Sequence, residues 1–191
     1  MKVKSINEKI HLVVPIYADD EDVITAYVHS APISRDVFEA HFLLISKTFT
    51  ALYAEGLGDI AGPRIAYYLL QECAKKMGDP GGAAALLNEI RRLSNVLIRE
   101  NTGWTQYQFQ ETVDHQLLGE DDLAAVMNAI VYFIVASAMH QRQQIKTMVV
   151  AALRHWSAQT SSLDFMGFVG SFATSKTVTD FPKVAASSVV F

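Results

Sequence analysis

The feature that most constrains this fold is a run of 17 residues, 123–139, without one charged side chain (LAAVMNAIVYFIVASAM). Apolar side chains occupy all sides of a helix with this sequence, and such a helix needs burial around nearly its whole circumference. Three acidic residues at 120–122 precede the run, and their charge favours a helix start through the helix dipole. The sequence therefore predicts a buried central helix at 123–139.

A membrane span is the alternative explanation of this run. Seventeen residues lie at the lower limit for crossing a bilayer, and Asn128 and Ser137 interrupt the apolar sequence. Amphipathic segments elsewhere in the chain also need a common core on which to pack. Burial in a protein core is therefore favoured over a membrane span, and solubility without detergent would distinguish the two.

Amphipathic helices are predicted on both sides of the central run. Apolar residues recur at helical spacing in 38–52, 65–77 and 86–97, where the last stripe is Leu86, Ile90, Leu93 and Leu97. The aromatic and glutamine-rich segment 104–118 is also predicted to be helical. A further stripe covers 140–157, which either continues the central helix or follows a break near 140–144.

The first thirty residues favour β-structure instead. Two short β-branched runs, 10–14 and 23–29, flank the polar residues 18–22, which is typical of a hairpin. Pro15 confines its strand to an edge or ends it early. Because an isolated hairpin is marginally stable, we expect this one, at about 8–30, to pack on the helices or to pair with another chain.

Together these segments predict a mainly α fold. The expected architecture is a bundle of about six helices around the buried central helix, with a small N-terminal β-hairpin and a C-terminal tail. Residues 1–157 form the single domain of this prediction, and 158–191 form a Ser/Thr-rich tail with one short amphipathic element. A chain of this length is typical of one domain.

The tail carries the candidate binding residues. Phe165, Phe168 and Phe172 lie at helical spacing, and Phe181 is the next phenylalanine along the chain. Exposed phenylalanines are costly, and an amphipathic aromatic stripe is typical of a segment that docks into a groove. The groove can belong to a partner or to the chain itself, and the sequence does not distinguish a partner-binding tail from one that covers its own core.

Composition and motifs argue against several other functions. A net charge of −4 is unlike the basic surface of nucleic-acid-binding proteins, and the single Cys73 excludes an internal disulfide framework or a cysteine-rich zinc site. Glu111, Asp114 and His115 could share a helix face, but a solvated polar face explains them better than a metal or acid–base site. We therefore predict a non-catalytic protein with no metal and no cofactor.

The chain resembles the tail assembly chaperones of long-tailed bacteriophages. The resemblance consists of a helical body of this size, a Ser/Thr-rich C-terminal tail and the sequence TSSLDFMGFVGSFATSK at Thr160–Lys176. The segments NEIRRLSN at Asn88–Asn95 and Thr102-Gly103-Trp104 are similar to parts of phage tail-cluster proteins. The resemblance as a whole covers about half of the chain.

The resemblance implies a function in the cytoplasm of an infected host cell. Proteins of this family hold the tape measure protein soluble and assist the polymerisation of the tail-tube protein around it. Both would then be partners of this chain, without nucleic acid or membrane, and self-association is compatible with the role. Two alternatives stay open: a structural minor tail or connector component of the virion, and a small helical ligand-binding or enzyme domain.

Overall fold

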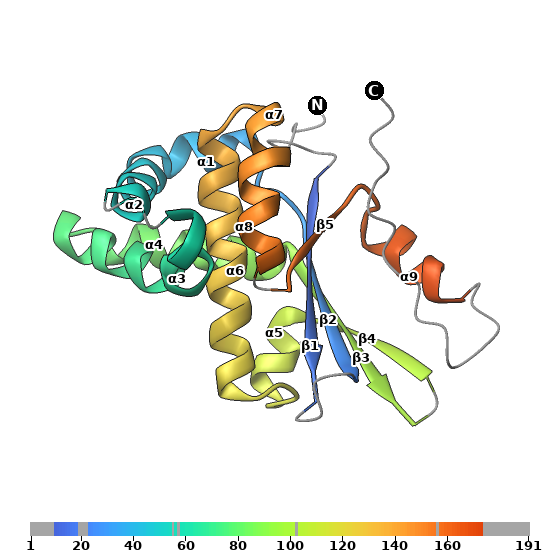
Figure 1. Cartoon of the computed structure of the whole chain (residues 1–191). Coiled ribbons are helices and arrows are strands. Elements are labelled where there is room, and N and C mark those ends of the chain that lie inside the picture. The colour runs from blue at the N-terminus through green and yellow to red at the C-terminus, as the bar shows by residue number, and fades with distance from the viewer. Residues whose placement is uncertain are drawn as a thin grey trace.

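The computed structural model describes residues 10–18, 23–54, 56, 58–101, 103–155 and 157–173. They form a five-stranded antiparallel sheet with a layer of helices on one face and a single short helix on the other (Figure 1). The strands are β1 (His11–Tyr17), β2 (Ile24–Ser30), β3 (Ser94–Glu100), β4 (Gly103–Gln108) and β5 (Gln159–Ser161). Their order across the sheet is β4-β3-β2-β1-β5.

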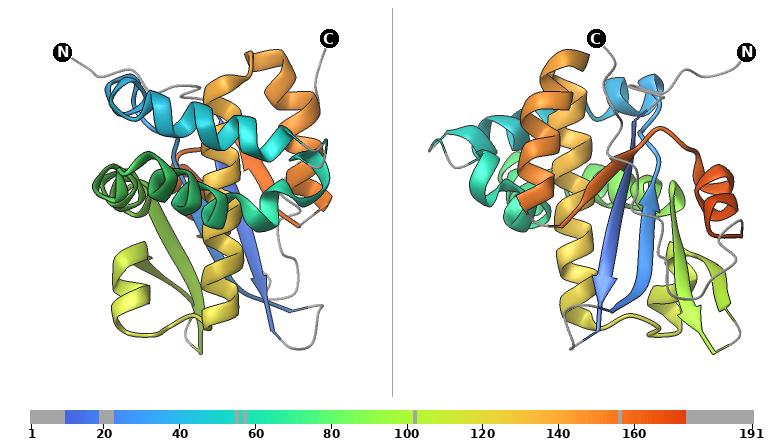
Figure 2. Two further views of the ribbon diagram at one scale, coloured as in Figure 1. Left: turned by 90° about the vertical axis from the view of Figure 1, so that its left-hand side faces the viewer. Right: turned by 45° about the vertical axis from the view of Figure 1, so that its right-hand side comes forward.

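The helices of the larger layer come in two runs, one between β2 and β3 and one between β4 and β5. They are α1 (Arg35–Ala40), α2 (Phe42–Tyr53), α3 (Gly58–Met77), α4 (Pro80–Arg92), α5 (Phe109–Asp114), α6 (Glu120–Met139), α7 (Arg142–Gln144), the π-helix η1 (Ile145–Val149) and α8 (Val150–His155). The last helix, α9 (Phe165–Ala173), lies alone on the opposite face of the sheet (Figure 2).

The mainly α prediction is wrong, because the structure has a mixed α/β fold with a five-stranded sheet. The error lies in two segments predicted to be helical. The stripe 86–97 divides into α4, which ends at Arg92, and β3, which begins at Ser94. The segment 104–118 begins inside β4 and continues with α5.

The physical reason for this error is that β3 is buried on both faces. Val96 contacts the helical layer, whereas Leu97 contacts the α9 side, and both are fully buried. A strand covered on both faces lacks the alternation of polar and apolar residues that identifies a strand. The four-residue spacing between Leu93 and Leu97 therefore resembles a helical stripe although only Leu93 adjoins the helix.

The predicted hairpin exists, but it lies inside the sheet. β1 and β2 pair antiparallel, with Val14 opposite Val28. β2 also pairs with β3, and the first residues of β1 pair with β5. Both strands of the hairpin thus have strand neighbours on both sides, and the open edge suited to pairing with another chain belongs to β4.

The central helix is confirmed as α6, whose residues 126–137 are buried. It packs between β1 and the helices α2 and α3. Of the described helices, α6 is the one long and apolar enough to cross a membrane, and 67% of its most apolar window is buried inside this fold. The helix does not continue from α6 into α7, because His140 between them adopts an extended conformation.

Packing between α3 and α6 depends on two polar or small residues. A Cβ atom at Gly62 would lie 2.5 Å from the Tyr132 ring, so the two helices approach closely only because Gly62 has no side chain. One turn earlier on α6, Asn128 accepts a hydrogen bond from the backbone N–H of Tyr67 (3.0 Å) and donates one to Ala124 O (2.9 Å). The side chain of Asn128 thus links α6 to the backbone of α3.

The segment predicted as a tail contributes to the fold at its beginning. Leu12 pairs with Thr160 of β5, and Phe168 of α9 is 2% exposed. β5 therefore belongs to the same sheet as the other strands, and α9 packs in a second, smaller core on the other face of that sheet. Residues 174–191, including Phe181, lie outside the described residues.

Candidate functional site

The candidate site is the face of the sheet that lies beneath α9. Alternate residues of neighbouring strands point to this side, and they bring Val13, Tyr27, Leu97 and Trp104 together. We call these four residues the aromatic face. Val13, Tyr27 and Leu97 are buried and Trp104 is half-buried. Their immediate neighbours Leu12, Val28 and Val96 face the other way, into the main core.

Aromatic rings hold α9 against the aromatic face. The centroid of the Tyr27 ring lies 5.6 Å from that of Phe168 and 5.3 Å from that of Phe172. Trp104 lies 5.5 Å from Tyr27 and 5.3 Å from Phe172. These separations are in the range where edge-to-face and tilted ring pairs are favourable. Helix α9 thus packs against aromatic side chains of β2 and β4.

The sequence of α9, FMGFVGSFA, has little tendency to form a helix by itself. It contains two glycines, and each costs about 1 kcal/mol relative to alanine in a helix interior. A nine-residue helix is also too short to be stable alone in water. Asp164 supports its first turn by accepting a hydrogen bond from Gly167 N (2.8 Å). The helical state of α9 therefore depends on its contact with the sheet.

His29 joins the segment before α9 to the middle of the sheet. Its side chain is 1% exposed, and its Nε2 lies 3.1 Å from the carbonyl oxygen of Leu163, to which the Nε2–H donates. The imidazole ring contacts Phe165 and Phe168, with centroid separations of 5.6 Å in both pairs. This buried hydrogen bond fixes the loop that leads into α9.

The environment of His29 opposes its protonation. Burial is the main cause that lowers the pKa of His29 from 6.5 to about 4, and the neighbouring His11 ring, 5.1 Å away, acts in the same direction. The hydrogen bond to Leu163 and the charge of Asp164 raise the pKa and oppose this effect. The Nδ1 atom is buried without a hydrogen-bond partner among the described residues. A protonated ring would place an unsatisfied donor there.

The predicted binding residues lie in different places. Phe168 and Phe172 contact the aromatic face, and Phe165 contacts His29. Phe181 lies outside the described residues. Of the two alternatives for the groove, the structure shows these three side chains on the chain's own sheet. On the outer side of α9, Met166 is 67% exposed.

Sequence reasoning does not identify the sheet residues that receive the phenylalanines. It places Tyr27 and His29 in the hairpin and Trp104 in a helix. The alternation of Thr25, Tyr27 and His29 with smaller residues is the signal that could have placed the first two on one face. No local pattern indicates that β4 brings Trp104 next to them.

The acidic residues and histidine of α5 do not converge on a site. Glu111 accepts a hydrogen bond from Gln108 N (2.8 Å) in the capping box of α5, and Asp114 accepts one from the Gln110 amide (2.8 Å). His115 is exposed at the end of the helix. Within the described residues, no group of three or more His, Cys, Asp or Glu residues could hold a metal ion.

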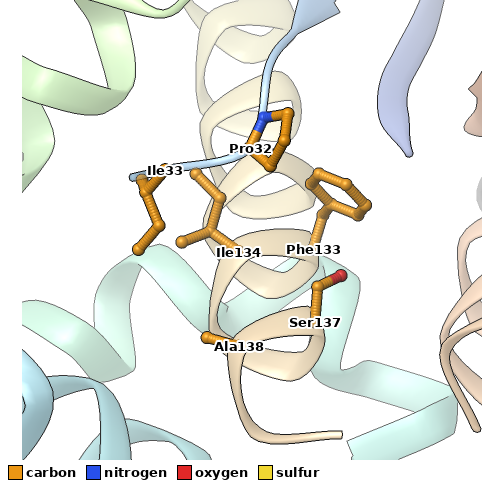
Figure 3. A pocket seen from close by; sticks show the side chains of 6 residues that line it. All are labelled: Pro32, Ile33, Phe133, Ile134, Ser137 and Ala138. Carbon is orange, nitrogen blue, oxygen red and sulfur yellow. The ribbon is translucent and has the colours of Figure 1, made fainter. Parts of the chain in front are cut away.

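A small pocket between the β2–α1 connection and α6 is shown in Figure 3. It has room for about one water molecule. The residues that line it are Pro32, Ile33, Phe133, Ile134, Ser137 and Ala138. The pocket is too small for an organic substrate, and its lining contributes a single side-chain hydroxyl.

No family model, curated protein or solved structure matches this chain. The arrangement of α9 on the aromatic face is therefore the structural basis for any functional proposal.

Proposed function

We propose that this chain is a non-catalytic assembly chaperone that binds an apolar helix of another protein on its aromatic face. The observation that carries the proposal is that the aromatic face is covered by α9. Within the described residues, α9 is the helix that lies over it, and α9 is short, uncharged and dependent on the sheet for its helicity. A partner helix with a similar aromatic stripe would make the same ring contacts in place of α9.

The resemblance to tail assembly chaperones extends this proposal to a specific client. The tape measure protein would supply the apolar helices, the tail-tube protein would be a second partner, and both would be met in the host cell cytoplasm. The mainly helical body that formed part of the resemblance is contradicted by the five-stranded sheet. The extension therefore depends on the similar sequence segments, chiefly Thr160–Lys176, whose described part contains α9.

Displacement of α9 by a client can be tested with variants of α9 itself. Phe172→Ala removes a ring from Tyr27 and Trp104 without changing the sheet, so it should loosen α9 and increase client binding. Met166→Ala on the exposed side is the matched control and should leave binding unchanged. A fluorescent peptide with the sequence of residues 163–173 serves as the probe, because it presents the chemistry that the face already accepts.

The expected result is saturable peptide binding that strengthens severalfold in Phe172→Ala. The displacement proposal would be refuted if the peptide bound neither Phe172→Ala nor Met166→Ala, or if it bound these two variants equally. Co-expression with a phage tape measure protein tests the narrower claim separately. Recovery of that protein in the soluble fraction supports it, whereas an insoluble client beside a peptide-binding chaperone would refute the tape measure assignment alone.

The structural virion component remains the second candidate, because β4 leaves one edge of the sheet open. Mass spectrometry of purified particles separates the two functions. A chaperone is absent from mature virions, whereas a structural component is present in fixed copy number.

A further inference from the structure

The open edge formed by β4 differs from the opposite edge of the sheet. Within the described part of the chain, β3 is the strand that pairs with β4, and their register continues without a bulge. The sequence of β4, GWTQYQ, contains no charge and no proline. At the other edge, β5 covers the start of β1, and Pro15 and a bulge near Ile16 interrupt the rest of that strand. Natural sheets protect exposed edges by such devices, which β4 lacks.

The direction of the β4 backbone groups can be derived from the ladder. Ala31 N–H donates to Leu93 O (3.0 Å) between β2 and β3, so the odd-numbered residues of β2 direct their backbone groups toward β3. Tyr27 pairs with Leu97 in this ladder. Because directions alternate along a strand, the odd-numbered residues of β3 point toward β2 and the even-numbered residues point toward β4.

The same alternation carries through to the edge. Ile98 pairs with Thr105, so Thr105 directs its N–H and C=O groups toward β3. Its neighbours Trp104 and Gln106 then direct theirs toward the open edge. The backbone groups of Gln108 also point toward the open edge, but the Gln108 N–H already donates to Glu111 Oε2 (2.8 Å) in the capping box of α5. Trp104 and Gln106 therefore supply the complete donor and acceptor pairs of this edge.

We propose that β4 pairs antiparallel with β4 of a second copy of this chain, with a two-fold axis at Thr105. Trp104 then exchanges two hydrogen bonds with the partner's Gln106, and the symmetric pair supplies two more. Thr105 lies opposite the partner's Thr105 as a non-hydrogen-bonded pair, and threonine pairs are favourable at such positions. The choice of a second copy rests on β4 itself, since β4 has no charged side chain to oppose its own copy and this register leaves the Gln108 cap intact.

The pairing would join two sheets into one sheet of ten strands. Its axis is perpendicular to the sheet, so both copies of α9 lie on the same face, and the two aromatic faces are adjacent. The inference does not depend on the chaperone function. Nevertheless, it would provide such a protein with two neighbouring binding faces for one long helical client.

Analytical ultracentrifugation measures the association directly. The monomer has a mass of 21.1 kDa. An edge pair of this length is smaller than the roughly 1,200 Å² of a standard interface, so the measurement should extend to about 200 µM protein. We expect a reversible dimer that Gln106→Pro weakens at least tenfold, because it removes from both copies an edge-directed N–H that β3 does not use. Gln106→Ala keeps this N–H, so it is the matched control and should dimerise like the wild type.

A disulfide cross-link tests the register without relying on a destabilising change. Cα atoms of a non-hydrogen-bonded antiparallel pair are about 4.5 Å apart, which is within the range for a disulfide. In a Cys73→Ser background, Thr105→Cys should give a covalent dimer on oxidation, and a cysteine at the exposed Gln71 of α3 should not. A monomer at all concentrations without cross-linking, or a dimer insensitive to Gln106→Pro, would overturn the proposal.

Discussion

Acidification should release α9 from the sheet, and His29 should be responsible. The docked state holds the pKa of His29 at about 4, below the ordinary value of 6.5, mainly because the ring is buried. Between these two values the released state binds more protons than the docked state, so docking becomes less stable as the pH falls. The stabilisation from a neutral His29 is thus complete above about pH 6.5 and is lost progressively toward pH 4.

The size of the effect is set by the difference between the two pKa values. A depression from 6.5 to about 4 corresponds to about 3 kcal/mol over the whole window, if release returns the imidazole to water. Between pH 7 and pH 5 the expected loss is about 2 kcal/mol, or roughly a 20-fold change in the docking equilibrium. The ring is 1% exposed in the docked state, so solvent screening does not reduce this difference appreciably.

Fluorescence of Trp104 provides the assay, because its ring contacts Phe172 of α9. The chain contains two tryptophans, so the experiment is done in a Trp156→Phe background. A titration from pH 7 to pH 4 should show exposure of Trp104, accompanied by faster amide exchange in α9. His29→Gln retains an N–H donor for Leu163 O but does not titrate, and it should flatten the response.

His115→Gln is the matched control, since His115 is exposed and distant in the sequence from α9. This variant should retain the wild-type response to pH. An identical titration of the wild type and His29→Gln would refute the assignment to His29. A wild-type chain without any change between pH 6.5 and pH 4 would refute the coupling between protonation and docking.

Two further predictions concern the packing of α3 on α6. Gly62→Ala should lower the free energy of unfolding by about 1–3 kcal/mol in urea denaturation, because its Cβ would overlap the Tyr132 ring, whereas Gly81→Ala, which has open space in α4, should be neutral or stabilising. Asn128→Ala should cost about 1–3 kcal/mol, since it removes the hydrogen bonds of the buried Asn128 side chain with Tyr67 N and Ala124 O, and an unchanged denaturation midpoint would contradict that role.

The elements that are predicted correctly have strong local signals. The 17 uncharged residues of 123–139 lead to α6 because a buried helix hides this many apolar side chains in one segment. The two β-branched runs 10–14 and 23–29 lead to β1 and β2, which pair antiparallel as the predicted hairpin. Both signals depend on residues within a few positions of each other.

The elements that are predicted incorrectly depend on distant partners. β3 pairs with β2 across a long stretch of chain, for example His29 with Asn95, and no local pattern reports this contact. The spacing of Leu93 and Leu97 is compatible with a helix, but Leu97 pairs with Tyr27 of β2 and therefore lies in a strand. Tertiary pairing thus overrides a local helical pattern.

The candidate site shows the same division. The stripe Phe165, Phe168 and Phe172 can be identified from helical periodicity in the sequence alone. The groove that receives it is assembled from β1, β2, β3 and β4, whose aromatic-face residues are far apart in the chain. The sequence by itself determined that 123–139 is an apolar helix and that the stripe Phe165, Phe168 and Phe172 needs a packing partner. Only the tertiary structure decided that this partner is the chain's own sheet, because strand pairing over long separations carries no signal in the local order of residues.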